Sequence, residues 1–280
     1  MIKNNNLHGF PLSRRAALAA VAVSAATLFA FAAPAPSFAA DKSIKVGIMA
    51  GEEEDIWRVV TTEAAKKGLK IETITFNDYT QPNEALERGE LDANAFQHQP
   101  YLDSQIAARG YKIVPIGFTL VAPIGFYSKK HKAIAELPDG ATIGIPNDPS
   151  NGGRALNLLA ANGLIKLADG KGLLPSVLDI ADNPKKLAFK EIDAAQIPNL
   201  LPDLDGAVIN TNYALGAGLN PRTEALLQEN RTGNPYGNFI AVRAEDKDKP
   251  LFRKLIASYQ NKEVAEFIEA NFKGAILPAW

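Results

Sequence analysis

The sequence has 280 residues, enough for two domains of ordinary size, and its 30 Lys and Arg nearly balance 31 Asp and Glu, which gives a formal net charge of -1 at pH 7. This balance includes no basic excess that would indicate a nucleic-acid partner and no acidic tail. The sequence contains no cysteine, which excludes disulfides, thiolate metal sites, a cysteine nucleophile and a lipid-anchored cysteine within it.

The N-terminal segment has the pattern of a cleavable signal peptide, predicted to span residues 1–39. Arg14 and Arg15 supply positive charge before an uncharged, alanine-rich run at 16–33, and small residues follow at 37–39, where a signal peptidase is expected to cleave. A retained membrane helix is the alternative, but the run is barely long enough to cross about 30 Å of hydrocarbon. We therefore expect a soluble, periplasmic protein without a lipid anchor, and the paired arginines hint at twin-arginine export.

Hydrophobic periodicity then predicts a repeated alternation of strands and helices. Apolar and small residues alternate at 44–49 as in a strand, and four acids at 52–55 then occupy the first turn of a helix that ends at Gly68. The expected elements that follow are strand 69–76, helix 82–88, strand 91–96, helix 100–109 and strand 111–116. This alternation is typical of a parallel sheet with helices on both of its faces.

The remaining elements indicate a second α/β domain and a return to the first. An apolar run at 118–127, interrupted by Pro123, is interpreted as a strand that crosses between the domains. The expected elements of the second domain are strand 142–146, helix 154–161, mixed loop and short helix at 169–182, strand 188–192, helical turn 196–201 and strand 206–210. Strand 239–243 is expected to return to the first domain, and helices 250–259 and 262–272 to close the chain. The predicted domains are therefore 40–121 together with 234–280, and 122–233.

The stretch at 92–101 concentrates flat, partly polar side chains where a strand ends and a helix begins. Because the side chains of a strand alternate between its faces, Phe96 and His98 are expected to point to the same side. Tyr101 follows Pro100, a residue that is favourable in the first turn of a helix. Ligands of open α/β sheets bind at such strand ends, so these residues are candidates for a binding site. The alternative is that the rings belong to the core and that the imidazole is buried and hydrogen-bonded.

The second domain contributes a cationic candidate, and several amides accompany it. Arg154 follows an Asn-Gly-Gly sequence at the expected start of a helix, where free backbone N–H groups gather, and its planar guanidinium can grip a carboxylate. The alternative for this residue is an interdomain or surface ion pair. Asn210 ends one expected strand and Asn238 begins another. An amide side chain can serve either a carboxylate or an ammonium group, or it can bond its own backbone in a turn.

Patterns typical of catalytic and metal sites are missing from the sequence. It has no Gly-x-Ser-x-Gly, no His-Glu-x-x-His and no phosphate-binding glycine loop. Beyond the predicted signal peptide it holds two histidines, His98 and His131, so a histidine-rich zinc site is not expected, and His131 is expected at the surface. We therefore expect a protein that is not an enzyme and that uses no cofactor. The alternative is an extracytoplasmic hydrolase using His98, which needs a serine or water nucleophile beside that imidazole.

A series of ordered sequence blocks runs from about residue 44 to the end of the chain. The first half contains Thr-Phe-Asn-Asp-Tyr at 75–79, Pro-Asn-Glu-Ala-Leu at 82–86 and Asp-Ala-Asn-Ala-Phe-Gln-His-Gln-Pro-Tyr-Leu-Asp at 92–103. The second half contains Pro-Asn-Asp-Pro-Ser-Asn at 146–151 and Pro-Tyr-Gly-Asn at 235–238. In these blocks the sequence closely resembles the methionine-binding NlpA/MetQ lipoprotein family, the extracytoplasmic receptors of methionine ABC importers.

The resemblance implies a fold, a ligand and partners. It implies a type II-like, two-lobed periplasmic-binding-protein fold that closes on its ligand in a cleft between two α/β domains. The function implied is a monomeric receptor that binds D- or L-methionine and delivers it to the membrane permease of an ABC importer. Another amino acid or a methionine-containing dipeptide is the alternative ligand for the same fold. The family usually carries a cysteine for lipidation at the end of its signal peptide, which this sequence lacks, so a freely diffusing receptor is expected.

The resemblance also implies which residues form the site. An aromatic box around the ligand side chain is expected from Tyr79, Phe96, His98 and Tyr101. The expected partner of the ligand carboxylate is Arg154. The expected partners of the other backbone groups of the amino acid are Asn151, Asn210 and Asn238. Because the aromatic box lies in the first lobe and the guanidinium in the second, the ligand is expected to bridge them.

Overall fold

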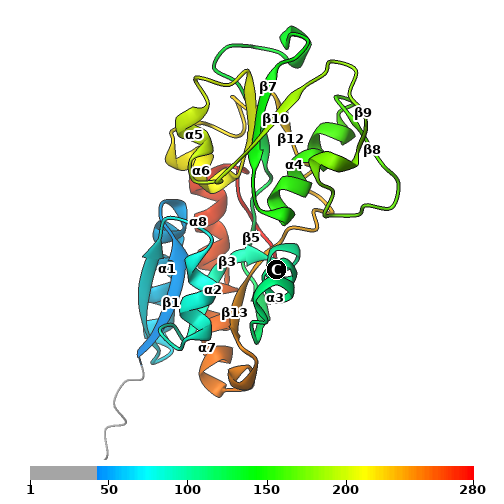
Figure 1. The fold of residues 1–280 in the computed structure, drawn as a ribbon. Helices are drawn as coiled ribbons and strands as arrows, with labels where there is room; N and C mark the ends of the chain where they lie inside the picture. Colours follow the sequence, from blue (N-terminus) through cyan, green and yellow to red (C-terminus); the bar gives the residue numbers. More distant parts are fainter. Residues whose placement is uncertain (1–42) are drawn as a thin grey trace, which may run out of the picture. The chain divides into compact units, whose positions relative to one another are not determined.

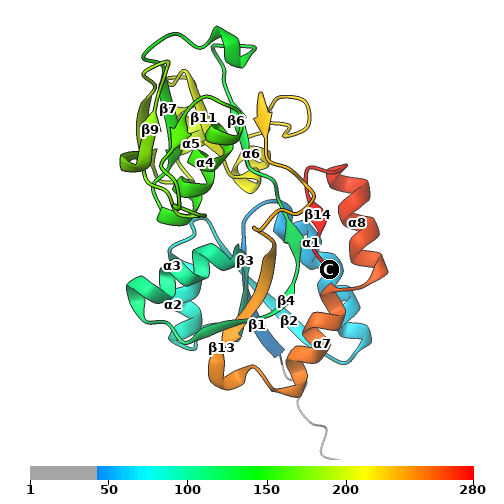
Figure 2. The same cartoon turned by 90° about the vertical axis from the view of Figure 1, so that its right-hand side faces the viewer.

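The computed structural model describes residues 43–280, which Figures 1 and 2 show as a ribbon in two views. The predicted signal peptide at 1–39 lies outside the described residues. The described chain contains two five-stranded sheets with helices beside them and two small sheets of two strands each. Within residues 43–280, no helix combines the length and the apolar character needed to span a bilayer.

The first sheet has the strand order β2 (Lys70–Phe76), β1 (Ser43–Met49), β3 (Ala93–His98), β13 (Asn238–Arg243) and β4 (Ile113–Phe118). β1 is parallel to β2 and to β3, as the alternation of strands and helices predicts. β13 runs antiparallel to both of its neighbours, so the prediction of a purely parallel sheet is wrong at this strand. The chain leaves this sheet after β4 and comes back into it along β13, and the two strands therefore run in opposite directions.

Helices cover both faces of the first sheet, as predicted (Figure 2). One face carries α2 (Gln81–Glu87) and α3 (Gln99–Arg109), and the other carries α1 (Glu52–Lys66), α7 (Pro250–Tyr259) and α8 (Lys262–Phe272). α1 buries Ile56, Trp57 and Val60 at helical spacing. Trp57 packs edge-on against Tyr259 of α7, with ring centroids 5.4 Å apart, and this contact joins the two helices over the core of the first sheet.

The second sheet has the strand order β10 (Ala188–Ile192), β7 (Thr142–Pro146), β11 (Gly206–Ile209), β6 (Gly125–Tyr127) and β12 (Leu227–Gln228). β10, β7 and β11 are parallel, whereas β6 is antiparallel to both β11 and β12. The sheet packs on α4 (Pro149–Ala161), whose Leu156 and Leu159 lie in one core with Ile143 and Val208 of the strands. This second core is separate from the core around Trp57.

The remaining elements are short. They are helices α5 (Ile197–Leu200) and α6 (Thr211–Gly216), 3-10 turns at Ile134–Glu136, Val177–Asp179 and Ala244–Asp246, and the paired strands β5 (Leu120–Val121) with β14 (Leu277–Pro278) and β8 (Lys166–Leu167) with β9 (Ile180–Asp182). β14 brings the C-terminal end of the chain against β5, where the chain passes from the first sheet to the second. The described residues therefore form the two-lobed α/β fold expected from the sequence, whereas lobe boundaries at 121/122 and 233/234 stay predictions.

The apolar run at 118–127 differs from the sequence prediction. It does not form one crossing strand, because Pro123 separates β5 from β6 and the two strands pair in different sheets. A proline lacks the N–H that a continuous strand donates, so pairing stops there. Several elements are also absent from the prediction: the helix α6 after Asn210, the strand β12 near residue 227, and the short strands β8, β9 and β14.

The start of α4 is a second difference, and it changes the environment of Arg154. The helix begins at Pro149, so Arg154 lies inside it rather than among the free N–H groups of its first turn. Asp148 caps the helix, because its Oδ1 accepts a hydrogen bond of 2.9 Å from the backbone N of Asn151. Asp-Pro is therefore the local start signal, and the glycines at 152 and 153 lie within the helix.

Candidate functional site

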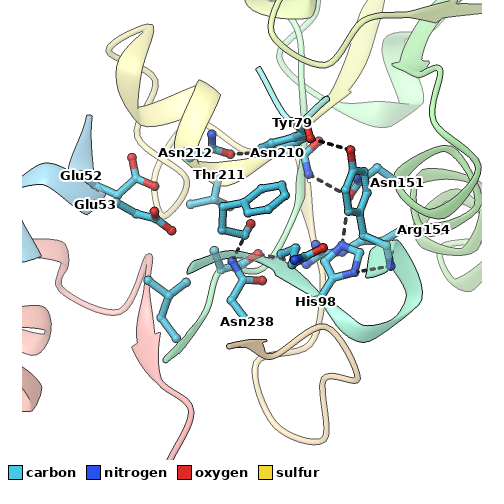
Figure 3. A pocket seen from close by; sticks show the side chains of 15 residues that line it. Glu52, Glu53, Tyr79, His98, Asn151, Arg154, Asn210, Thr211, Asn212 and Asn238 are labelled. Carbon is cyan, nitrogen blue, oxygen red and sulfur yellow. Dashed lines mark hydrogen bonds between the residues drawn. The ribbon is translucent and has the colours of Figure 1, made fainter. Parts of the chain in front are cut away.

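A pocket lies between the two sheets and brings together all eight residues expected in the site (Figure 3). It contains about 490 Å³ of space free of protein atoms, its open mouth included. The predicted residues along its wall are Tyr79, Phe96, His98, Tyr101, Asn151, Arg154, Asn210 and Asn238. The wall also includes residues that the sequence reasoning missed, among them Glu52, Glu53, Thr211 and Asn212.

Aromatic rings form the wall of the pocket on the side of the first sheet. The ring centroid of Tyr79 lies 6.1 Å from Phe96 and 6.0 Å from Tyr101, and the latter two are 5.8 Å apart. His98 stands edge-on to Tyr101 at 6.4 Å. Tyr213 of α6, in the second lobe, was not predicted, and its ring packs 5.0 Å from that of Tyr79 behind this wall. Phe96 and Tyr101 are buried and also line the pocket, so the core and pocket interpretations describe the same rings.

β3 reaches this wall through an irregularity in its pairing. Against β13, Gln97 pairs with Phe239 and Ala95 pairs with Ile240, so Phe96 has no partner of its own, which is the pattern of a β-bulge. The strict alternation of faces expected for this strand is therefore interrupted at Phe96. Bulges re-aim side chains beside binding sites, and here the bulged residue itself lines the pocket.

A chain of hydrogen bonds sets the orientation of the imidazole and of the amides. Asn151 Nδ2 donates to both carboxylate oxygens of Asp148, at 3.2 and 3.0 Å, which turns Asn151 Oδ1 toward the pocket. This oxygen accepts from Asn210 Nδ2 at 2.9 Å and lies 3.2 Å from His98 Nε2. Because an amide oxygen is an acceptor, Nε2 carries the proton. The other ring nitrogen, Nδ1, accepts from the backbone N of Tyr101 at 3.3 Å.

His98 is consequently a neutral, fully engaged imidazole. Burial, together with the positive charge of Arg154, lowers the pKa of His98 to about 3. Its two ring nitrogens contact an amide oxygen and a backbone N–H, and neither contacts a serine within residues 43–280. The arrangement therefore lacks the pairing of base and nucleophile that the hydrolase alternative requires.

The guanidinium of Arg154 is held by hydrogen bonds to two groups of the second lobe and by a contact with Tyr236. Its Nε donates to Oε1 of Glu229 at 2.8 Å, and its Nη2 donates to Oε2 of Glu229 at 2.5 Å and to the carbonyl oxygen of Ala122 at 2.9 Å. The guanidinium carbon also lies 4.2 Å from the ring centroid of Tyr236. An ion pair is thus present, but it lies within one lobe and is largely buried, so it is neither the interdomain nor the surface pair that the sequence left open. Nη1 has no such partner among residues 43–280, so its N–H groups remain to bind an anion at the pocket.

Two amides offer acceptors to a ligand. The amide of Asn210 uses its Nδ2 to donate to Asn151 Oδ1. Its Oδ1 is buried and has no hydrogen-bond partner within the described part of the chain. Asn238 Nδ2 donates to the carbonyl oxygen of Phe96 at 3.2 Å, which leaves its Oδ1 as an acceptor. A buried acceptor without a partner is costly, so Asn210 favours a ligand that brings a donor, such as an ammonium group.

Two acidic residues on the wall were missed by the sequence reasoning. Glu52 and Glu53 begin α1 and are 8% and 5% exposed, although a run of four acids suggests a solvated helix start. Their spacing indicates this burial. Ile56 and Trp57, which are buried, follow four residues later, and side chains four residues apart lie on one face of a helix. Glu53 Oε2 accepts from the backbone N of Met49 at 2.9 Å, whereas Glu52 Oε2 has no partner within residues 43–280.

Burial changes the protonation of both carboxyl groups. Removal from water raises the pKa of Glu52 from 4.5 to about 7, and the charge of Asp55 contributes in the same direction. Burial also raises the pKa of Glu53 well above its ordinary range, with the charge of Glu52 adding to it. The pocket therefore contains a carboxyl group, Glu52, that loses its proton near neutral pH.

Replacing Glu52 with glutamine is expected to stabilise the ligand-free protein at high pH. The folded state holds the Glu52 proton up to a pKa of about 7 and the unfolded state only up to about 4.5, so the free energy of unfolding falls as pH rises between these values. The gain from Glu52→Gln should be larger at pH 8 than at pH 4 by about 3 kcal/mol. Urea unfolding at both pH values measures it, with the exposed Glu72→Gln as the control. An equal gain at both pH values would contradict the assignment.

Hydrogen bonds connect the two lobes across the pocket. The hydroxyl of Tyr79 donates to Asn212 Oδ1 at 2.5 Å, and the hydroxyl of Tyr213 donates to the carbonyl oxygen of Asn77 at 3.2 Å. The contact of His98 with the amide of α4 is a third connection. Each bond joins the first lobe to the second, so the lobes touch around the pocket as well as through the crossing segments.

The described residues contain no group that resembles a metal site. Within residues 43–280, no three His, Asp or Glu side chains gather so as to hold a metal ion. His131, expected at the surface, is partly buried, and its Nε2 lies 3.4 Å from Asp205 Oδ1. The chemistry of the pocket is therefore that of rings, amides, one arginine and two carboxyl groups.

Similarity to known proteins extends over nearly the whole described chain. Residues 44–280 match the family model of the NlpA lipoprotein. The D-methionine-binding lipoprotein MetQ of Escherichia coli (strain K12) is 48% identical over 240 residues, which are 85% of this chain and 88% of the relative. Lipoprotein 28 of the same organism is 44% identical over 242 residues, 85% of this chain and 89% of that protein.

A solved structure shares the fold at higher identity. A nutrient binding protein from Burkholderia cenocepacia, solved bound to methionine, is 55% identical and superimposes with a TM-score of 0.83 over 85% of this chain and 100% of that one. Because the family model matches residues 44–280 and the relatives align over most of this chain and of their own length, the chain belongs to the NlpA lipoprotein family.

Proposed function

We propose that the chain is a periplasmic solute-binding protein that binds methionine, in its D or L form, and delivers it to the membrane permease of an ABC importer. The observation that carries the proposal is a pocket in which the rings of one lobe face Arg154 and the amides of the other. The relatives support it, since one is named as D-methionine-binding and another is solved bound to methionine. In this role the chain binds and releases its ligand and is not an enzyme.

Each part of the ligand has a matching group in the pocket. The carboxylate accepts hydrogen bonds from Arg154 Nη1, and the ammonium group donates to Oδ1 of Asn210 and of Asn238. The side chain lies against the aromatic box, where a thioether gains about 0.3–1.5 kcal/mol for each contact with a ring. Asn151 acts through Asn210. Its Oδ1 accepts a hydrogen bond from Asn210 Nδ2, and this bond orients Asn210 Oδ1 toward the ligand.

Contact with both lobes gives the ligand its effect on conformation. A ligand shifts a protein only toward the state that it binds more tightly, and methionine touches the box and Arg154 together only when the lobes approach. The hydrogen bonds from Tyr79 and Tyr213 to the opposite lobe further stabilise the closed state. The moving units are 40–121 with 234–280, and 122–233, in a monomer. The closed, loaded form then docks on the permease.

Attachment to the membrane is a finer part of the proposal. The relatives are named lipoproteins, and lipidation of such proteins takes place on a cysteine, but this sequence contains none. We infer that the protein acts in the periplasm without a lipid on cysteine. Detergent phase partitioning of the expressed protein tests this: recovery in the detergent phase would contradict the inference.

Ligand screening of the purified protein tests the function directly. Thermal shifts should single out methionine among the amino acids, because a ligand at 100 times its dissociation constant stabilises by about 2.7 kcal/mol. Calorimetry with each enantiomer then gives the preference between D and L. Native mass spectrometry of co-purified ligand separates methionine from another amino acid or a methionine-containing dipeptide. Absence of a shift with both enantiomers would refute methionine as the ligand.

Replacing Asn238 with alanine should weaken methionine binding without unfolding the protein. The change removes an acceptor of the ammonium group, and a hydrogen bond to a charged group contributes about 1.5–3 kcal/mol. Asn238 is partly exposed at the start of β13 and makes one side-chain hydrogen bond, so stability should hardly change. Calorimetry and thermal unfolding of the same samples measure both, with the exposed Asn162→Ala as control. Unchanged affinity would remove Asn238 from the site.

A further inference from the structure

Glu52 is a pocket residue to which the methionine proposal assigns no role. It is 92% buried, since its exposed fraction is 8%, and it lines the pocket. Its Oε2 has no hydrogen-bond partner among residues 43–280, whereas the neighbouring Glu53 is satisfied by a backbone N–H. A buried carboxylate is strongly unfavourable unless a donor or a cation meets it, so the pocket at Glu52 favours a ligand that brings one.

Among residues 43–280, no cationic side chain pairs with Glu52 Oε2. The titratable groups around Glu52 are Glu53 and Asp55 on its own helix, Tyr79 after β2, Tyr213 on α6 and Tyr259 on α7. Every one of them is an acid. Burial consequently raises the pKa of Glu52 to about 7, so the site is neutral below this pH and negative above it.

Glu52 lies away from the group that takes the ligand carboxylate. Figure 3 shows Glu52 at one side of the pocket and Arg154 at the other, with Asn238 between them. The carboxylate and the ammonium group of an amino acid share one carbon, so both are used at the end of the pocket where Arg154 and the amides lie. What extends toward Glu52 is therefore the end of the ligand side chain.

Aromatic rings line the same pocket. Tyr79 lines the pocket together with Glu52 and Arg154, and burial raises its pKa. Tyr213 and Phe96 flank Tyr79, with ring centroids at 5.0 and 6.1 Å. Ring faces attract cations, and cages of such rings bind quaternary ammonium groups. Aromatic rings in the same pocket as an unpaired carboxylate therefore favour the binding of a positive charge.

We propose that Glu52 forms a subsite for a positively charged side-chain end, so that the pocket binds, besides methionine, amino acids in which a short apolar stem ends in a sulfonium or ammonium group. This inference rests on the proposed amino-acid-binding function and extends its ligand class. The sulfonium derivative of methionine, S-methylmethionine, is the sharpest probe, because it differs from methionine by one methyl group and a permanent charge. Its sulfonium does not titrate, so a pH dependence specific to it reports on the protein.

Calorimetry with methionine and S-methylmethionine at pH 5.5 and 7.5 tests the proposal. In the wild-type protein, the affinity for the sulfonium relative to methionine should rise on the order of tenfold between these pH values, as Glu52 ionises. In Glu52→Gln the ratio should no longer depend on pH, and at pH 7.5 it should be about tenfold lower than in the wild type. The exposed Glu72→Gln, a matched change outside the pocket, should retain the wild-type ratio and its pH dependence.

The possible failures separate the two proposals. If methionine binds and S-methylmethionine does not, or if Glu52→Gln and Glu52→Ala both leave the ratio of affinities unchanged, the Glu52 subsite is refuted and the methionine receptor stands. If neither compound nor any other amino acid binds, the proposed function itself fails. The glutamine variant keeps the size of the side chain and removes its charge, so a lost ratio in a variant that still binds methionine cannot come from unfolding.

Discussion

Replacing Arg154 with alanine is expected to weaken methionine binding by two to three orders of magnitude. The change removes the Nη1 donors of the ligand carboxylate, and loss of one partner of a buried, hydrogen-bonded charge pair costs about 2–5 kcal/mol. It also leaves Glu229, whose side chain is 12% exposed, without its partner. Affinity and stability should therefore both fall, and calorimetry with urea unfolding on the same protein measures the two effects.

Controls separate the loss of the ligand contact from the loss of the ion pair. The double variant Arg154→Ala with Glu229→Gln removes the unpaired charge, so it should recover stability but not affinity. Arg243→Ala is the matched control, because Arg243 is also partly buried, pairs with Asp246 and bonds the carbonyl oxygens of Leu86 and Leu91, away from the pocket. It should lose stability and keep affinity. Wild-type affinity in folded Arg154→Ala would exclude this residue from the site.

Replacing Asn83 with alanine should destabilise the protein by about 2–4 kcal/mol. Asn83 is fully buried on α2 and exchanges two hydrogen bonds with Gln97 of β3, of 2.8 and 2.7 Å, while its Oδ1 also accepts from Asn94 at 2.9 Å. Truncation leaves amide groups of both partners unsatisfied away from water, at about 1–3 kcal/mol each. Gln97 lies next to the bulged Phe96, so ligand affinity should also fall.

Urea unfolding measures the effect of Asn83→Ala as a lower midpoint at an unchanged slope. The control is Asn271→Ala, since Asn271 is exposed on α8 and bonds the backbone of its own helix, and it should change stability by less than about 0.5 kcal/mol. Equal stability of the two variants would mean that the buried amides relax to other partners. That result would remove the network as the support of β3.

Elements with a strong local pattern were predictable from the sequence. The strands expected at 142–146 and 188–192 and the helices expected at 250–259 and 262–272 have the bounds seen in the structure. Their periodicity and their stop signals are local, so neighbours in the sequence suffice to define them. The run at 118–127 failed for the opposite reason: its two parts pair with β14 and with β11, and those partners lie far away in the chain.

The pocket shows the same division. Its eight expected residues were named from the motifs that carry the family resemblance, and the rings at 96–101, Arg154 and two of the amides were also candidates from their places at a strand end or a helix start. The surroundings of Arg154 were not recognisable, because Glu229 is 75 residues away in the chain. Glu52 was not recognised as a pocket residue, because a run of acids is normally solvated, whereas here Glu52 and Glu53 are buried and line the pocket.

The sequence by itself determined most of the longer strands and helices, the resemblance to the family and the residue types that line the pocket. These follow from periodicity, from capping and from motifs, which are all properties of short segments. Only the tertiary structure decided the antiparallel β13, the bulge at Phe96, the partners of Arg154 and the buried state of Glu52. Each of these depends on which distant segment comes to lie alongside, because burial and hydrogen-bond pairing are set by neighbours in space rather than along the chain.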